Sequence, residues 1–425
     1  MAEKTALVLA LVALVFADQA FVGLNDNKTN LVLQPPAGGQ VVVGGHVFQA
    51  LVQKLDTLET RVEMLNAIIA NQSTIIANQS TVIDALQTQL TNNGVALKNT
   101  SIIELLRSQV GMLLGTIRTV DSADDVGQHT SLALTTAGLP VVAYYDGTNG
   151  DLKLAVCADV NCSSGTIIRT IDNTGDVGQY TSLALTPAGF PVISYFDNTK
   201  QDLKLAVCAD ATCSFGTTIR TIDSTNIVGL YTSLVLSTAG SPVISYRDAS
   251  KGDLKLAVCA DATCSSDTIT RTVDSTGSVG LYTSLALTSA GFPVISYHDL
   301  TNVDLKLAVC ADTSCSSGTT IRTIDSTGSV GQYTSLALTT AGFPVISYFD
   351  ETNENLKLAV CADATCSSLS SKTIRTVDNA GIVGGYTSLA LTPAGFPVIS
   401  YYDATNRDLK LAVCADATCS SSTIR

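Results

Sequence analysis

Apolar and polar residues follow two different periods along this chain. From Leu51 to Leu90, apolar residues recur alternately three and four positions apart, whereas from residue 116 onward they gather in short runs bounded by Gly, Pro, Asn, Asp or Ser. The first pattern has the period of about 3.5 residues that a coiled-coil helix requires, and the second is typical of β-strands. The sequence therefore predicts a helical stalk followed by an all-β region.

The predicted stalk covers residues 47–91. Apolar residues fill all but two of its inward heptad positions, and the exceptions, Gln72 and Gln79, occupy successive d positions. Buried amides must pair with one another, which favours a parallel homo-oligomer in fixed register through residues 51–90. Ile at the a positions with Leu at the d positions favours a coiled coil of two helices, whereas the Gln layers resemble those of trimeric fibre stalks. We favour the trimer over the dimer.

The segments around the stalk carry simpler signals. Residues 1–17 have the pattern of a secretory signal peptide, because Lys4 precedes an apolar run that is too short for a membrane anchor. Residues 18–46 are rich in Pro and Gly and predict a loop with one short strand at Val41–Val43. Residues 92–115 predict a neck with a short helix, since Ser101–Glu104 has the spacing of a capping box.

Residues 116–425 consist of six copies of a unit of about 51 residues. Each copy contains four strand-like runs, and the link to the next copy is longer than the hairpin-sized links within it. This is the pattern of a four-stranded propeller blade. We therefore predict a six-bladed β-propeller whose first segment, Thr116–Asp121, closes the last blade. A linear solenoid is the alternative, but its ends would need atypical capping repeats, and none is visible.

Every copy has a Cys-x4-Cys pair between its third and fourth strands. The chain contains 12 Cys but only three His, so these pairs lack the further ligands that zinc needs, and one disulfide per blade is favoured. Disulfides form in oxidising compartments, which agrees with the signal peptide in predicting a secreted protein. The predicted bridges are Cys157–Cys162, Cys208–Cys213, Cys259–Cys264, Cys310–Cys315, Cys361–Cys366 and Cys414–Cys419.

Charge and motif content exclude several functions. The formal net charge of −13 argues against nucleic-acid binding, which needs clustered Lys and Arg. His46, His129 and His298 accompany no nucleophile motif, and the chain has no Gly-x-Ser-x-Gly elbow or phosphate loop. We therefore expect that the protein is not an enzyme and that it binds no cofactor and no metal. The Lys, Arg and Asp residues that recur once per copy predict salt bridges between blades.

One face of the predicted ring gathers the starts of the first strands and the ends of the second strands. The residue before the last Asp of the second strand differs from copy to copy, whereas its neighbours scarcely change. This variation indicates either a binding face or drift at a solvent-exposed position. The candidate ligand-binding residues are His129, Tyr145, Tyr180, Phe196, Tyr231, Arg247, Tyr282, His298, Tyr333, Phe349, Tyr386 and Tyr402.

Asn-x-Ser/Thr sequons are candidate glycosylation sites in a secreted protein. Such short motifs also arise by chance in a chain rich in Ser and Thr. The sequons begin at Asn27, Asn71, Asn78, Asn99 and Asn161.

The repeats carry Gly-x-Pro-Val-Ile-Ser-Tyr-x-Asp followed by Leu-Lys-Leu-Ala-x-Cys. Over residues 116–425 the chain resembles extracellular propeller repeats of bacteria and viruses, and this resemblance implies a fold without implying a chemistry. Sialidase-like propellers share the architecture, but their Ser-x-Asp-x-Gly-x-Thr-Trp box is absent here. With no Trp in the chain, a sugar could stack only on Tyr or Phe. We expect a structural or adhesion protein, with a glycan-binding lectin as the alternative and a glycosidase-like enzyme as the least favoured function.

Overall fold

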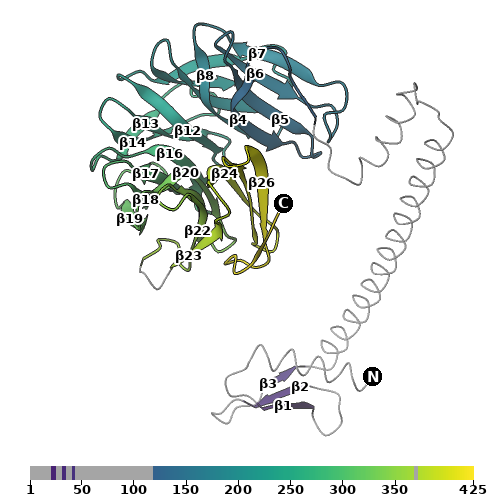
Figure 1. Cartoon of the computed structure of the whole chain (residues 1–425), viewed down its shortest axis with the longest axis vertical. Helices are drawn as coiled ribbons and strands as arrows, with labels where there is room; N and C mark the ends of the chain where they lie inside the picture. The colour runs from purple at the N-terminus through teal and green to yellow at the C-terminus, as the bar shows by residue number, and fades with distance from the viewer. Residues whose placement is uncertain (1–20, 25–30, 35–40, 44–117, 368–371) are drawn as a thin grey trace, which may run out of the picture. The chain divides into compact units, whose positions relative to one another are not determined.

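The structure is a computed structural model that describes residues 21–24, 31–34, 41–43, 118–367 and 372–425 (Figure 1). The chain divides into two compact units, residues 1–114 and 115–425. The predicted signal peptide, stalk and neck lie outside the described residues, as do the sequons at Asn27, Asn71, Asn78 and Asn99. Within the described ranges, no helix is long and apolar enough to cross a bilayer.

The first unit contains a three-stranded antiparallel sheet in the order β1-β2-β3. Its strands are β1 (Phe21–Leu24), β2 (Leu31–Gln34) and β3 (Val41–Val43). The sequence predicted only β3, within a loop. A single short strand leaves its backbone groups unpaired, and the two other apolar runs supply partners: Phe21 lies opposite Gln34, and Leu33 lies opposite Val41.

The second unit is the six-bladed β-propeller that the repeats predicted. Each blade is a four-stranded antiparallel sheet whose strands follow chain order. The strands of blades 1 to 3 are β4 (Val126–Leu134), β5 (Pro140–Asp146), β6 (Asp151–Val156), β7 (Ile167–Asp172); β8 (Val177–Leu185), β9 (Pro191–Asp197), β10 (Asp202–Val207), β11 (Thr218–Asp223); β12 (Val228–Leu236), β13 (Pro242–Asp248), β14 (Asp253–Val258) and β15 (Ile269–Asp274). Those of blades 4 to 6 are β16 (Leu281–Leu287), β17 (Pro293–Asp299), β18 (Asp304–Val309), β19 (Thr320–Asp325); β20 (Val330–Leu338), β21 (Pro344–Asp350), β22 (Asn355–Cys361), β23 (Lys372–Asp378); β24 (Val383–Leu391), β25 (Pro397–Asp403), β26 (Asp408–Cys414) and β27 (Ser422–Ile424).

The hydrophobic core lies between neighbouring blades. Leu203 and Leu205 of blade 2 pack in one cluster with Leu234 and Ile244 of blade 3, and clusters of the same kind join the other consecutive blades. Because a sheet in this position is covered on both sides, the second strand of a central blade, such as β9, is buried along its whole length. Each blade therefore needs a neighbour on both faces to bury its apolar residues.

The predicted salt bridges between blades are present, with an acceptor that the sequence analysis did not identify. Lys204 Nζ lies 2.7 Å from Asp172 Oδ2, which ends the fourth strand of the preceding blade, and Tyr195 donates its hydroxyl proton to the same oxygen at 2.7 Å. Asp197, one of the recurring Asp residues, belongs to the same blade as Lys204 and is farther away, at 3.4 Å. The recurring Arg side chains take no part in a salt bridge among the described residues. The acceptors are Asp121, Asp172, Asp223, Asp274, Asp325 and Asp378.

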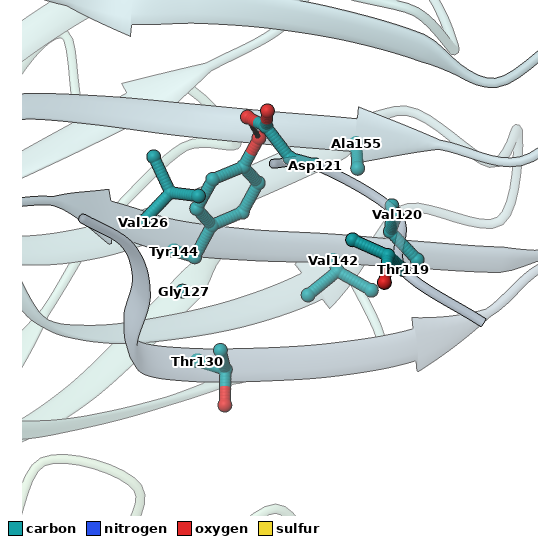
Figure 2. A pocket seen from close by; sticks show the side chains of 9 residues that line it. All are labelled: Thr119, Val120, Asp121, Val126, Gly127, Thr130, Val142, Tyr144 and Ala155. Carbon is teal, nitrogen blue, oxygen red and sulfur yellow. Dashed lines mark hydrogen bonds between the residues drawn. The ribbon is translucent and has the colours of Figure 1, made fainter. Parts of the chain in front are cut away.

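The last blade is completed by the C-terminus, so the prediction that Thr116–Asp121 closes it is wrong. β27 is the fourth strand of that blade, and Leu411 and Arg425 exchange two backbone hydrogen bonds of 3.0 Å beside it. These bonds occupy the edge of β26 that the N-terminal segment would have needed. The described residues 118–121 form no strand. Asp121 instead lies against blade 1, where Tyr144 donates to it at 2.6 Å (Figure 2).

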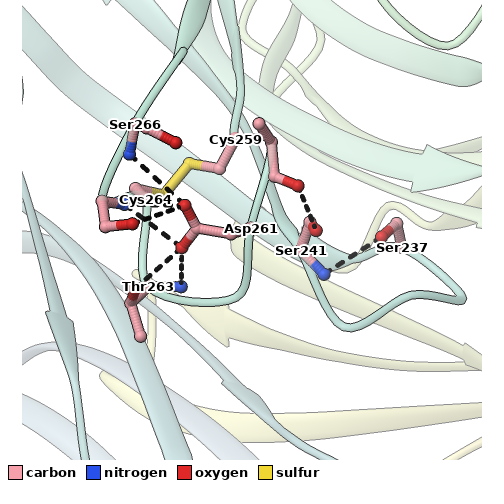
Figure 3. The surroundings of a disulfide bond; sticks show 9 residues. Ser237, Ser241, Cys259, Asp261, Thr263, Cys264 and Ser266 are labelled. Carbon is pink, nitrogen blue, oxygen red and sulfur yellow. Dashed lines mark hydrogen bonds between the residues drawn. A yellow bond between two sulfur atoms is a disulfide. The ribbon is translucent and has the colours of Figure 1, made fainter.

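The six predicted disulfides are confirmed, one in each hairpin between the third and fourth strands. In blade 3, Asp261 accepts hydrogen bonds from the backbone N–H and hydroxyl of Thr263 and from the backbone N–H of Ser266, beside the Cys259–Cys264 bridge (Figure 3). A loop of this length gains only about 2 kcal/mol from its bridge. The disulfides therefore fix individual hairpins, while the packing between blades holds the propeller together.

The sequon at Asn161 lies in the corresponding hairpin of blade 1. Asn161 is exposed, and its backbone N–H donates to Asp159 at 2.8 Å. Its side chain is therefore accessible for modification in the folded protein.

Candidate binding site at the axis of the propeller

The first strand of every blade bends at the same place. In β8, Gln179 lies opposite Phe196 and Ser182 lies opposite Ser194, so two residues, Tyr180 and the one after it, face a single residue of β9. This extra residue is a β-bulge, and Tyr180 has a φ of +54°, a left-handed conformation that costs roughly 1 kcal/mol. The bulge turns Tyr180 out of the strand alternation. The residues with this conformation are His129, Tyr180, Tyr231, Tyr282, Tyr333 and Tyr386.

These six aromatic residues form a continuous series, which we call the axial ladder. Each ring packs against the ring of the next blade in a tilted arrangement, with centroids 4.3–4.7 Å apart. The ladder residues of blades 2 to 5 are half-buried, and Tyr386 at the end of the series is 70 % exposed. Tyr386 is therefore largely accessible to solvent, whereas the rings of blades 2 to 5 are partly covered by one another.

The hydroxyls of Tyr180 and Tyr282 stay protonated at physiological pH. Burial, together with the neighbouring hydroxyl of Tyr231, raises the pKa of Tyr180 to about 12. The same two causes raise the pKa of Tyr282 to about 12. Tyr180 and Tyr282 thus present neutral hydroxyl groups, each able to donate and accept a hydrogen bond.

The second-strand positions that vary between copies form a layer beside the ladder. The rings among them pack against the ladder residue of their own blade, with centroids 6.2–6.5 Å apart. Tyr145, Phe196 and His298 are buried, Arg247 and Phe349 are half-buried, and Tyr402 in the last blade is exposed. In blades 1 to 5 the varying position is therefore an interior position between blades. The interpretation of its variation as drift assumed a solvent-exposed position, which these blades do not show.

Several of these varying side chains bind the next blade directly. Tyr145 donates to Asp176 at 2.7 Å, and Arg247 donates to the carbonyl of Val279 at 3.1 Å. His298 Nδ1 lies 3.0 Å from the carbonyl of Val330, so this nitrogen carries the proton. The structure thus brings all twelve candidate residues together in two layers, of which the ladder is the more accessible.

A set of hydroxyl groups behind the ladder was not identified from the sequence. Thr283 donates to the backbone carbonyl of Tyr231 in the preceding blade at 2.9 Å, and the hydroxyls of Ser245 and Thr283 are 2.8 Å apart. These bonds hold the strained backbone of one blade with a side chain of the next. The sequence feature that could have identified these hydroxyl groups is the Thr that follows the ladder residue in every copy.

We expect His298→Phe to reduce the loss of stability between pH 7 and pH 5. Burial lowers the pKa of His298, although its bond to Val330 and the nearby Asp299 act in the opposite direction. Since the unfolded side chain has the higher pKa, near 6.5, it binds a proton first, and the free energy of unfolding falls as the pH drops below that value. Phe occupies this position in blades 2 and 5, which makes it a compatible replacement.

Urea unfolding at pH 7 and pH 5, followed by circular dichroism, measures this difference. His129 is present in both the wild type and the variant, so any effect of its titration on stability is the same in both proteins. An equal pH dependence in wild type and variant would show that His298 is not the group responsible.

Comparisons with known proteins identify no family for this chain. No protein-family model matches the sequence, and no curated protein matches it. Similar solved structures are the SapL1 lectin in complex with alpha methyl fucoside (11 % identity, 70 % of this chain and 96 % of that chain, TM-score 0.45), an ulvan lyase of polysaccharide lyase family PL25 (11 %, 69 % and 81 %, 0.44) and an alpha-L-arabinofuranosidase from Fusarium graminearum (11 %, 72 % and 93 %, 0.43). At these identities the similarity concerns the fold alone.

Proposed function

We propose that this chain is a secreted stalk-and-head protein that acts in adhesion or as a surface structural element. Its stalk would form a parallel homo-oligomer, with a trimer favoured, and its propeller heads would contact a glycan or a surface protein. The observation that supports a binding role is the axial ladder: six aromatic side chains in strained left-handed backbone conformations, with hydroxyl groups of the following blade bonded behind it. Strained residues of this kind concentrate at functional sites.

Binding accounts for the chemistry of the ladder better than catalysis does. Its members repeat almost identically around the propeller, whereas a catalytic centre normally needs a unique set of an acid, a base and a nucleophile. Tyr180 and Tyr282 supply neutral hydroxyls and the ladder supplies aromatic rings, which suit the hydroxyls and C–H faces of an uncharged sugar. Lectin activity is therefore the more specific form of this proposal. Several heads on one stalk would multiply weak contacts.

A glycan array probed with the full-length protein tests the proposal. Tyr231→Phe removes one ladder hydroxyl, and Tyr231→Ala removes the ring as well, so we expect binding to fall in both and at least about tenfold in the Ala variant, equivalent to about 1.4 kcal/mol. Phe215→Ala is the matched control, because Phe215 is 69 % exposed and lies in a cysteine hairpin. Binding by all three variants at the wild-type level would exclude the ladder as the site.

Absence of binding to any glycan would remove the lectin form of the proposal. The same variants would then be tested for adhesion to intact cells. Adhesion that is unchanged by Tyr231→Ala would contradict the assignment of this face.

A further inference from the structure

The propeller contains two sets of tyrosines whose surroundings differ. The first set is formed by the five tyrosines of the axial ladder, which are half-buried or exposed. The second set has one member in the second strand of every blade, and none of its members is more than 3 % exposed. Solvent therefore reaches the ladder rings far more readily. The members of the second set are Tyr144, Tyr195, Tyr246, Tyr297, Tyr348 and Tyr401.

Hydrogen bonds and ring contacts separate the two sets as well. Each hydroxyl of the second set donates to an aspartate that precedes its blade in the chain, as Tyr195 does to Asp172 at 2.7 Å. Among the described residues, no pair of aromatic rings in contact includes a member of this set. The buried tyrosines are thus isolated from one another, whereas the ladder tyrosines contact one another ring to ring.

The ladder contains four pairs of neighbouring tyrosines. From blade 2 to blade 6, their ring centroids are 4.6, 4.7, 4.5 and 4.3 Å apart, and their planes are inclined by 40–55°. Tyr333 and Tyr386 form the closest pair and the most nearly parallel one. Rings at this separation are in van der Waals contact. Two ladder tyrosines that lose an electron each are therefore already in position to react with one another.

The rest of the chain leaves tyrosine as the main target of a one-electron oxidant. There is no Trp, and the 12 Cys are all held in the six disulfides, so no thiol competes. Six disulfides fit an oxidising compartment. Peroxides and radical oxidants act in compartments of this kind.

We propose that neighbouring tyrosines of the axial ladder are a site of oxidative dityrosine cross-linking, with Tyr333 and Tyr386 as the favoured pair. The oxidant is a peroxide that acts through a one-electron carrier such as a peroxidase. Each tyrosine gives up one electron and its phenolic proton, and the two phenoxyl radicals join through carbon atoms ortho to their oxygens. The hydrogen on each joined carbon then moves as a proton to the oxygen of its ring, which restores both phenols. One hydrogen peroxide takes up the two electrons and two protons and becomes two waters.

Such a bond would join two blades, which none of the six disulfides does. Tyr333 lies in β20 of blade 5, and Tyr386 lies in β24 of blade 6. Each disulfide instead closes a hairpin within one blade, as the Cys259–Cys264 bridge does (Figure 3). The cross-link would therefore add a covalent bond where the propeller otherwise depends on packing between blades.

A variant that keeps every ring but separates the tyrosines tests this proposal. Tyr231→Phe combined with Tyr333→Phe leaves Tyr180, Tyr282 and Tyr386 without a tyrosine neighbour in the ladder. Phe preserves the ring contacts and lacks the phenolic hydroxyl, so the variant should fold and should be unable to form the cross-link. Circular dichroism before oxidation checks that it is folded.

The matched control is Tyr145→Phe combined with Tyr402→Phe. These tyrosines belong to neither set, so the control loses the same number of tyrosines and keeps the ladder intact. Full-length wild type, variant and control are oxidised at low protein concentration, once with hydrogen peroxide and a haem peroxidase and once with a small photochemical one-electron oxidant. We expect dityrosine fluorescence in wild type and control, and loss of this fluorescence in the variant.

Peptide mapping by mass spectrometry locates the bond. We expect a cross-linked pair of peptides that contain Tyr333 and Tyr386, lighter by two hydrogen atoms than their sum, from a protein that migrates as a single chain on a denaturing gel. Wild type without dityrosine, or a variant that keeps the wild-type fluorescence, would overturn the proposal. A bond mapped to Tyr386 and Tyr402, whose rings are 6.4 Å apart, or cross-links found only between chains, would do the same. None of these results depends on ligand binding by the ladder.

Discussion

Replacing Asp172 by Asn is expected to lower the free energy of unfolding by about 3 kcal/mol, because it removes the nearer carboxylate of the buried Lys204 and leaves only Asp197, at 3.4 Å. The two side chains are 11 % and 1 % exposed, and the Lys204 ammonium lies 2.7 Å from the carboxylate. Asn keeps the volume of Asp but cannot offer a negative charge. Since the chain has no Trp, urea unfolding followed by far-ultraviolet circular dichroism is the suitable measurement.

The double variant Asp172→Asn with Lys204→Met is the matched control. It removes both charges, so it should recover part of the stability lost in the single variant. A double variant that is less stable than Asp172→Asn alone would show that Lys204 contributes through its packing on Tyr195, over which its ammonium lies 5.8 Å from the ring centre, more than through its charge.

The same network makes the propeller sensitive to acid. Burial acts to raise the pKa of Asp172, but hydrogen bonds from Lys204, Thr174 and Tyr195 outweigh it, so the pKa lies below its ordinary value of 3.8. The unfolded carboxylate therefore binds a proton first as the pH falls. The stability that this group contributes is complete above about pH 4 and is lost below it.

The sequence predicted the blades well because each blade is a local meander. Strand runs, turn residues and the Cys-x4-Cys pair all lie within one copy, so they could be recognised without knowing how copies meet. The Lys204 partner was missed because Asp172 belongs to the preceding copy and comes near Lys204 only when two blades pack. The recurrence of Lys204 in every copy indicated a salt bridge, but recurrence does not identify the acceptor.

The backbone of the axial ladder could not be predicted for a different reason. Strand alternation places Tyr180 on one face of β8, and tyrosine is not a residue that usually adopts a positive φ. Hydroxyl groups of the next blade, such as that of Thr283 for Tyr231, bond to the backbone in that conformation, and they come from a different copy of the repeat. The exposure of Leu132 in blade 1 and of Leu409 in blade 6 was likewise hidden, because both residues stand in the same sequence context as their buried counterparts.

Gly229→Ala is expected to destabilise the propeller by about 3 kcal/mol, whereas Gly127→Ala should cost about 1 kcal/mol. Both glycines have a positive φ, +97° and +93°, so both substitutions carry similar backbone strain. Only the Cβ at position 229 collides with the backbone of a neighbouring blade, at Leu203. The difference between the two variants therefore measures the cost of separating two packed blades.

Thermal and urea unfolding of the two glycine variants should differ as stated. Equal losses would show that the close approach of Gly229 to Leu203 does not hold blades 2 and 3 together.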